Sequence, residues 1–207
     1  MKNLILVFAI LFTVCANAQL KMGLKAGLNI STLSGDDVEI RRQSPESKTG
    51  FTVGAFFLHQ FSDMFAIQPE IYFTSKGATY QIPDDEVTID MIFNYIEIPV
   101  LLKLIIPIEN SPVHPTIFTG PFIAINSTAK AEEEIAGRSS DRDLDDIKST
   151  EFGLQFGGGI GFIIENNELG FDVRYILGLT NIDDSENEDD GKNSVISFNV
   201  YFGFSLL

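Results

Sequence analysis

The C-terminal segment alternates strictly between large apolar side chains and small or polar ones. The apolar residues at every second position are Ile196, Phe198, Val200, Phe202, Phe204 and Leu206. The positions between them hold Ser197, Asn199, Tyr201, Gly203 and Ser205. Because successive side chains of a β-strand point to opposite faces, this pattern predicts a strand with one apolar face and one small or polar face.

The same alternation recurs in earlier segments, so the sequence predicts eight strands. Their expected ranges are 22–32, 50–61, 65–76, 92–105, 115–129, 151–164, 168–179 and 194–206. The connections alternate in length: 62–64, 107–114 and 165–167 are short or moderate, and 33–49, 77–91, 130–150 and 180–193 are long. No segment shows the 3.6-residue period of an amphipathic helix.

The N-terminal residues 1–18 have the pattern of a secretory signal peptide. A short positive start precedes the apolar run 4–14, and Ala16-Asn17-Ala18 is a small-x-small cleavage site. The run is too short for a spanning helix, which needs about 20 apolar residues. Lipid attachment at Cys15, the only cysteine, fits the preceding residues poorly. We therefore expect residues 19–207 to form one cysteine-free barrel domain.

Alternation alone does not say which face of a barrel points outward. A soluble, lipocalin-like barrel turns its apolar face inward, whereas a membrane barrel turns it towards lipid. Here the polar face is rich in glycine and poor in charge, which suits a crowded interior better than a solvated surface. The pattern favours an all-β fold, an eight-stranded antiparallel up-and-down transmembrane β-barrel in the bacterial outer membrane. Membrane lipid and the barrel-insertion machinery are then its expected partners.

Acidic residues are concentrated in the predicted long connections. The formal net charge is −15, and 22 of the 29 acidic residues lie in segments 36–46, 84–90, 132–151 and 183–190. This charge argues against nucleic-acid binding, which needs a basic surface. Segment 183–191 is dense in oxygen ligands but lacks EF-hand spacing, so we expect solvated loops and no metal site.

Six ionisable residues fall on the predicted inward face. They are Lys25, Glu70, Glu97, Lys103, Asp172 and Arg174, three acids and three bases. Charges in a narrow interior are costly unless they are paired, and an eight-stranded barrel is just wide enough for side chains to fill it. We expect a structural network of ion pairs; a proton or solute path is the alternative.

No arrangement in the sequence predicts catalysis or a cofactor. His59 lies near the end of the second predicted strand, and His114 lies in a predicted turn between two prolines. Neither has a nucleophile close to it in the sequence. We therefore expect no catalytic, cofactor-binding or metal-ligating residues.

Several segments resemble the porin-like outer-membrane β-barrel domain family, a group of small eight-stranded barrels. The residues that carry the resemblance are Gly23–Asn29, Gln68-Pro69-Glu70, Lys76-Gly77, Tyr95–Lys103, Gly120-Pro121, Phe152-Gly153, Gly157-Gly158-Gly159, Arg174-Tyr175, Gly178-Leu179 and Asn181-Ile182. The resemblance implies the fold and the location but no reaction. Barrels of this kind often end on an aromatic residue, whereas this chain ends Phe204-Ser205-Leu206-Leu207, so we expect Phe202 and Phe204 to guide insertion.

Three functions remain open at this point. The first is a non-enzymatic, monomeric surface protein whose acidic loops serve envelope integrity, adhesion or partner binding. The second is a narrow pore for ions or small solutes. The third is a lipid-active barrel enzyme, for which the predicted outer rim offers carboxylates and serines but no histidine.

Overall fold

The computed structural model describes residues 19–35, 40, 43–82, 87–135, 138–144, 147–182 and 191–206. The expected signal peptide, residues 1–18, and the acidic segment 183–190 lie outside the described residues. Within the described part of the chain, no helix is long and apolar enough to cross a membrane.

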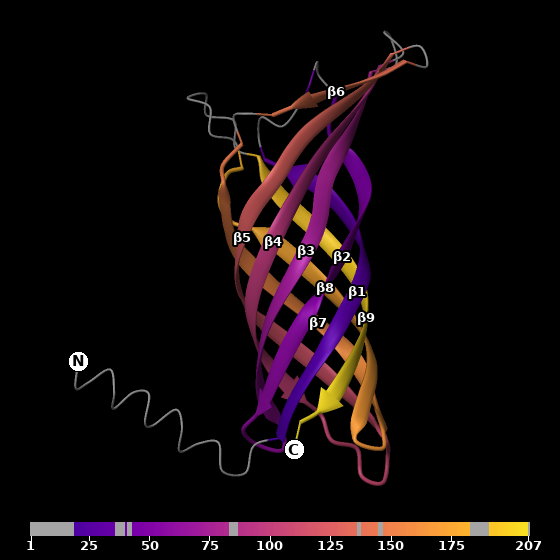
Figure 1. Cartoon of the computed structure of the whole chain (residues 1–207), viewed down its shortest axis with the longest axis vertical. Helices are drawn as coiled ribbons and strands as arrows, with labels where there is room; N and C mark the ends of the chain where they lie inside the picture. Colours follow the sequence, from indigo (N-terminus) through magenta and orange to yellow (C-terminus); the bar gives the residue numbers. More distant parts are fainter. Residues whose placement is uncertain are drawn as a thin grey trace, which may run out of the picture.

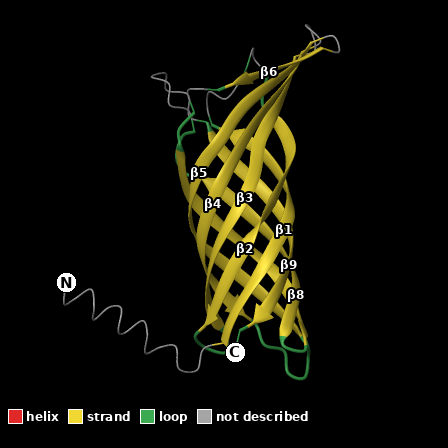
Figure 2. Ribbon diagram, in the orientation of Figure 1, coloured by secondary structure: helices red, strands yellow, loops and turns green. Residues whose placement is uncertain are grey.

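Eight long strands close into one antiparallel barrel (Figures 1 and 2). They are β1 (Gln19–Ser34), β2 (Glu46–Gln60), β3 (Phe65–Ile82), β4 (Val87–Ile105), β5 (Val113–Ile135), β7 (Thr150–Ile164), β8 (Asn167–Gly178) and β9 (Lys192–Ser205). Neighbours in sequence pair with each other, and β1 pairs with β9 to close the ring. Within the described part of the chain, the short strand β6 (Arg138–Asp143) pairs with β5 alone. The predicted fold is confirmed.

The barrel has one end with short turns and one with long connections. At the short-turn end, segments 61–64, 106–112 and 165–166 join β2 to β3, β4 to β5 and β7 to β8. The C-terminus lies at this end, and β6 lies at the opposite, long-loop end (Figure 1). The predicted short turns are confirmed, as are long connections close to 33–49 and 180–193, whereas the other two predicted long connections are wrong.

The outward face of the barrel wall is apolar. Leu24 and Ile117 are 64% and 54% exposed, whereas the alternate, inward positions hold buried polar residues such as Glu70 and Glu97. A soluble barrel has the opposite arrangement, because its outer surface meets water. This belt of exposed Leu, Ile, Val and Phe is matched to lipid, and the lipocalin-like alternative is excluded.

The strands are longer than predicted at the long-loop end. Segment 77–91 was expected to be a loop, but β3 continues to Ile82 and β4 begins at Val87. Segment 130–150 was also expected to be a loop, but β5 runs to Ile135 and forms a hairpin with β6. The polarity of the pattern reverses here: the inward residues of β3 and β4 become apolar and the outward residues polar.

These extensions enclose an apolar core at the long-loop end. Its buried residues are Leu33, Ala78, Tyr80, Ile82, Val87, Ile89, Phe93, Tyr95, Phe122, Ala124, Ala129, Ala131, Ile176, Ile182 and Val195. Asn94 pairs with Thr128 and Tyr95 with Asn126, so Ser127 forms a β-bulge. Before the bulge the inward residues of β5 have even numbers, and after it they have odd numbers. The small residues Ala129 and Ala131 therefore face this core.

Truncation of Ile89 to alanine should test whether the extension is a packed core. Ile89 is buried in it, whereas Ile98 on the same strand faces outward in the apolar belt. We expect Ile89→Ala to lower the free energy of unfolding by about 2–5 kcal/mol, because it leaves a cavity. Ile98→Ala should cost less, because detergent chains occupy the vacated space. Urea unfolding in detergent measures both, and equal losses would contradict a packed extension.

Candidate functional site

A central cluster of four charged side chains crosses the barrel interior. Lys25 Nζ lies 2.8 Å from Glu70 Oε1 and 2.9 Å from Asp172 Oδ2. Arg174 lies 2.6 Å from Glu70 through Nη1 and 2.8 Å from Asp172 through Nε. These residues come from β1, β3 and β8 and are all buried. Two cations therefore balance two carboxylates.

Neutral polar groups complete the hydrogen bonding of this central cluster. Asn199 Nδ2 donates to Asp172 Oδ1 at 2.8 Å, and Gln68 donates to Glu70. Arg174 donates to Tyr72 Oη, and its guanidinium lies 4.9 Å from the centre of the Phe118 ring. Buried charges are tolerated when they are paired and hydrogen-bonded in this way.

Glu97 belongs to a second, upper cluster nearer the long-loop end. Lys76 Nζ lies 2.6 Å from Glu97 Oε2 and 3.6 Å from Glu151 Oε2. Asn193 donates to Glu151 at 3.0 Å. Gln155 joins the clusters, because it donates to Glu97 and accepts a 3.2 Å hydrogen bond from Arg174. Here two carboxylates share one lysine.

A third, lower cluster lies at the short-turn end. Glu168 accepts from Lys21 at 2.7 Å and from Tyr201 at 2.8 Å, and it lies 3.1 Å from His114 Nε2. Lys103 is close by, but it makes no ion pair with any described residue. Its Nζ donates to Gln68 Oε1 at 3.3 Å and lies 5.1 Å from the centre of the Tyr201 ring.

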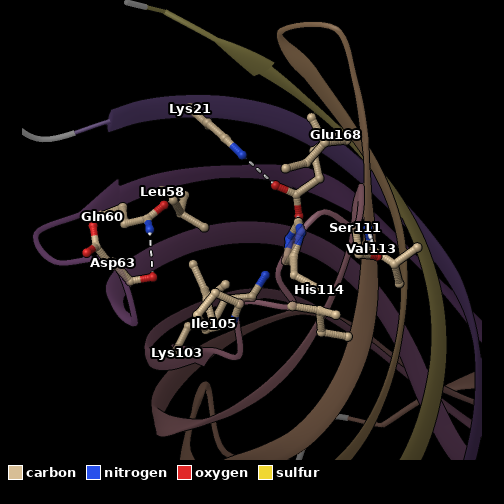
Figure 3. Close-up of a pocket in the computed structure, with 13 residues that line it drawn as sticks. Lys21, Leu58, Gln60, Asp63, Lys103, Ile105, Ser111, Val113, His114 and Glu168 are labelled. Atoms are coloured by element: carbon tan, nitrogen blue, oxygen red, sulfur yellow. Dashed lines mark hydrogen bonds and ion pairs between the residues drawn. The ribbon is translucent and has the colours of Figure 1, made fainter.

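The lower cluster borders a pocket of about 200 Å³ (Figure 3). Lys21, Glu168 and His114 line one side of this pocket, and Lys103 approaches from another strand. The turns 61–64 and 106–112 contribute residues to its wall.

Glycines on the inward face make room for aromatic rings. A Cβ atom at Gly157 would overlap the Phe118 ring, and one at Gly170 would overlap the Tyr201 ring. These rings therefore lie against bare backbone on the neighbouring strand. Rings and ion pairs together occupy the middle of the barrel.

The structure buries all six sequence-predicted residues inside the barrel. It brings together Lys25, Glu70, Asp172 and Arg174, and it separates Glu97 and Lys103 from them. Four further charged members of the clusters were not predicted, and they are Lys21, Lys76, Glu151 and Glu168. Each lies at or next to the end of a predicted strand. Each also falls in the alternating series of inward positions along its strand, and this alternation is the signal that identifies it.

His114 also differs from the sequence-based expectation. It was placed in a turn, but it is the second residue of β5 and is buried beside Glu168. Among the described residues, no three His, Cys, Asp or Glu side chains are grouped so that they can hold a metal ion.

Removal of Glu70 should destabilise the barrel more than removal of Glu97. Glu70→Gln leaves both Lys25 and Arg174 short of a carboxylate, and breaking a buried pair costs about 3–5 kcal/mol. Glu97→Gln should cost less, because Glu151 remains near Lys76. The exposed Glu134 provides a control, since Glu134→Gln should leave the urea midpoint unchanged. Equal midpoints for all three variants would mean that the inward charges are hydrated.

Solved structures with a similar fold are small outer-membrane proteins. OprG from Pseudomonas aeruginosa aligns with a TM-score of 0.55 at 14% identity, covering 91% of this chain and 95% of OprG. Neisserial surface protein A aligns at 0.49 with 15% identity, covering 87% and 95%. Ail, the attachment invasion locus protein of Yersinia pestis, aligns at 0.42 with 16% identity, covering 89% and 98%. No curated protein matches this sequence significantly.

A family model gives the assignment. The model of the outer membrane protein beta-barrel domain matches residues 16–184, which is most of the chain. This match agrees with the closed eight-stranded barrel, its apolar outer belt and its fold-level similarity to OprG. The chain therefore belongs to the outer membrane protein beta-barrel domain family and is a protein of the bacterial outer membrane.

Proposed function

We propose that this protein is a closed, non-enzymatic anchor that displays an acidic β-sheet at the cell surface and binds an extended, basic partner there. In outer-membrane barrels the short turns face the periplasm and the longer loops face the exterior. By this rule the extensions of β3, β4 and β5, together with β6, project from the cell (Figure 2).

The single observation that carries this proposal is a row of carboxylates across three strands. The strand register sets Asp90 of β4 opposite Glu132 of β5, and Glu132 opposite Asp141 of β6. Neighbouring strands lie about 4.8 Å apart, and like charges directly opposite each other destabilise a sheet. Among the described residues, Glu132 and Asp141 have no ion-pair partner. A basic partner would relieve the repulsion.

Asp90 remains ionised at neutral pH and so contributes to the row. Burial raises the pKa of its carboxyl, but hydrogen bonds from Lys48 and Thr79 and the charge of Lys48 outweigh burial and lower that pKa below its usual value. Lys48 Nζ lies 2.7 Å from Asp90 Oδ2, at the β2 side of the row. The charge of Asp90 is thus partly compensated, whereas Glu132 and Asp141 face solvent.

Strand β6 supplies a backbone edge beside the carboxylates. Among the described residues it pairs with β5 alone, and its residues 139–143 are exposed. An unpaired strand edge accepts an extended peptide as an additional strand, with main-chain hydrogen bonds for affinity and side chains for specificity. The charge of the row selects a basic peptide.

The filled interior supports an anchor over a pore. The central cluster joins Glu70 of β3 to Arg174 of β8 across the ring, and in the upper cluster Lys76 of β3 lies 3.6 Å from Glu151 of β7. The apolar core lies beyond these clusters towards the long-loop end. An eight-stranded barrel leaves just enough interior space for such side chains.

We also infer that residues 1–18 direct export and are removed, and that the barrel is a monomer. The apolar run and the cleavage pattern support the first inference. Phe202 and Phe204, whose ring centroids are 4.9 Å apart, are the aromatic residues that we expect the insertion machinery to recognise.

The refolded protein should not conduct in a planar lipid bilayer. We expect no stepwise current, because ion pairs and rings occupy the interior. As a control, the double variant Glu70→Ser, Arg174→Ser removes a carboxylate and its guanidinium partner together. A current through this variant would establish that the assay detects an opened barrel. Stepwise currents from the unaltered protein would support the narrow-pore alternative.

A basic peptide should bind the extracellular end. The probe is a fluorescent peptide of alternating lysine and threonine, added to the protein in nanodiscs. We expect salt-sensitive binding that weakens about tenfold when Glu132, Glu134 and Asp141 become Gln, Gln and Asn, because exposed ion pairs contribute about 0.2–1 kcal/mol each.

The matched control changes net charge by the same amount at the other end of the barrel. Asp63→Asn, Glu109→Gln and Glu165→Gln alter three exposed acids of the short turns. This variant should bind the peptide as well as the unaltered protein does. Equal weakening in both triple variants would mean that the peptide senses only net charge, and the proposed surface would be wrong.

A further inference from the structure

Lys103 is a buried cation that lacks the carboxylate partner of its counterparts. It is 4% exposed, and the described residues offer its ammonium group one hydrogen bond, from Nζ to Gln68 Oε1 at 3.3 Å. Lys25 and Lys76, which are equally buried, each lie within 2.8 Å of a carboxylate oxygen. Because an ammonium group has three donors, Lys103 keeps donor capacity that the barrel does not use.

This unused capacity borders a cavity. The pocket of about 200 Å³ at the periplasmic end is lined by Lys103 together with residues of the turns 61–64 and 106–112. Figure 3 shows Lys103 extending into this region from the side opposite Glu168 and His114. A small molecule that enters between the two turns therefore meets the ammonium group.

The other charged groups around the buried part of the pocket are already paired. Glu168 Oε2 is bound to Lys21, and Glu168 Oε1 is bound to Tyr201 and lies beside His114. The charges of Lys21 and Glu168 thus compensate each other. Asp63 also lines the pocket but is exposed on its turn. Lys103 is the remaining buried charge, so the interior of the pocket favours an anion.

The rest of the wall determines what kind of anion fits. Leu58, Ile105, Val113 and Ile163 supply apolar surface, and Gln60 and Ser111 supply neutral polar groups. Pockets of this composition bind molecules that are mostly apolar and carry a polar group for orientation. Inorganic phosphate would leave the apolar wall unused, whereas a carboxylate on a short hydrocarbon chain uses both parts.

We propose that this periplasmic pocket binds a small organic carboxylate, with the carboxylate on Lys103 and a short apolar chain against Leu58, Ile105 and Val113. This inference is independent of the acidic surface, which lies at the other end of the barrel. It explains why the fold retains a buried charge without an ion pair: the partner of that charge is a ligand.

Hexanoate is the probe for this site, measured by calorimetry on the protein in nanodiscs. We expect saturable binding that weakens about tenfold or more in Lys103→Met, because a charge-assisted hydrogen bond is lost. Lys48→Met, at the extracellular end, should bind hexanoate unchanged. Hexylammonium, of the same length and opposite charge, and inorganic phosphate should bind weakly. Equal heats for hexanoate and hexylammonium would mean partition into lipid and would overturn the proposal.

Urea unfolding without ligand separates a binding role from a structural one. Since Lys103 has no ion pair to lose, Lys103→Met should keep or raise the urea midpoint, and only the unaltered protein should gain stability from hexanoate. A lowered midpoint in Lys103→Met, together with no hexanoate binding to the unaltered protein, would show that Lys103 is structural and that the pocket holds water alone.

Discussion

The hydrogen bonds between β1 and β9 are the interaction on which the rest of the structure depends. They run from Lys21–Ser205 to Ser34–Lys192 and turn a sheet with two edges into a closed wall. Inside a bilayer no water is present to satisfy a free strand edge, so a membrane sheet must close. Closure at eight strands then fixes a narrow interior. Inward side chains from facing strands therefore contact one another, and ion pairs and aromatic rings share that space.

The interior is divided into layers of different charge balance. The central cluster around Arg174 is neutral, the upper cluster has two carboxylates for Lys76, and the lower end keeps Lys103 without a carboxylate. The layers are linked by amides: Gln155 contacts the upper and central clusters, and Gln68 contacts Glu70 and Lys103. The balanced cluster thus lies between two clusters with unequal charges. The lower one borders the pocket, whereas the apolar core covers the upper one.

The alternation of apolar and polar residues along each strand was enough to predict the barrel and its outward face. It also predicted that residues such as Glu70 and Arg174 are buried. It did not predict which charges meet, because Glu70 on β3 and Arg174 on β8 come together only across the closed ring. The extensions of β3 and β4 were also missed. Around Tyr80 and Ile89 the apolar face turns inward, as in a soluble sheet, and the acidic residues nearby resembled a loop. The two-residue alternation continues at this point, but the apolar residues change from the outward to the inward face. This change marks the point where a strand leaves the membrane.

The length of β5 has a mechanical consequence. Its 23 residues form one strand from the short turn 106–112 to the hairpin with β6. At about 3.3 Å per residue it measures roughly 75 Å, whereas a tilted strand crosses a bilayer in about 9–11 residues. A load applied at the hairpin therefore runs along the strand axis into the wall. The load shears the rows of hydrogen bonds that join β5 to β4 and to β7. In shear many of these hydrogen bonds resist together, whereas a load across the strands would break them one at a time.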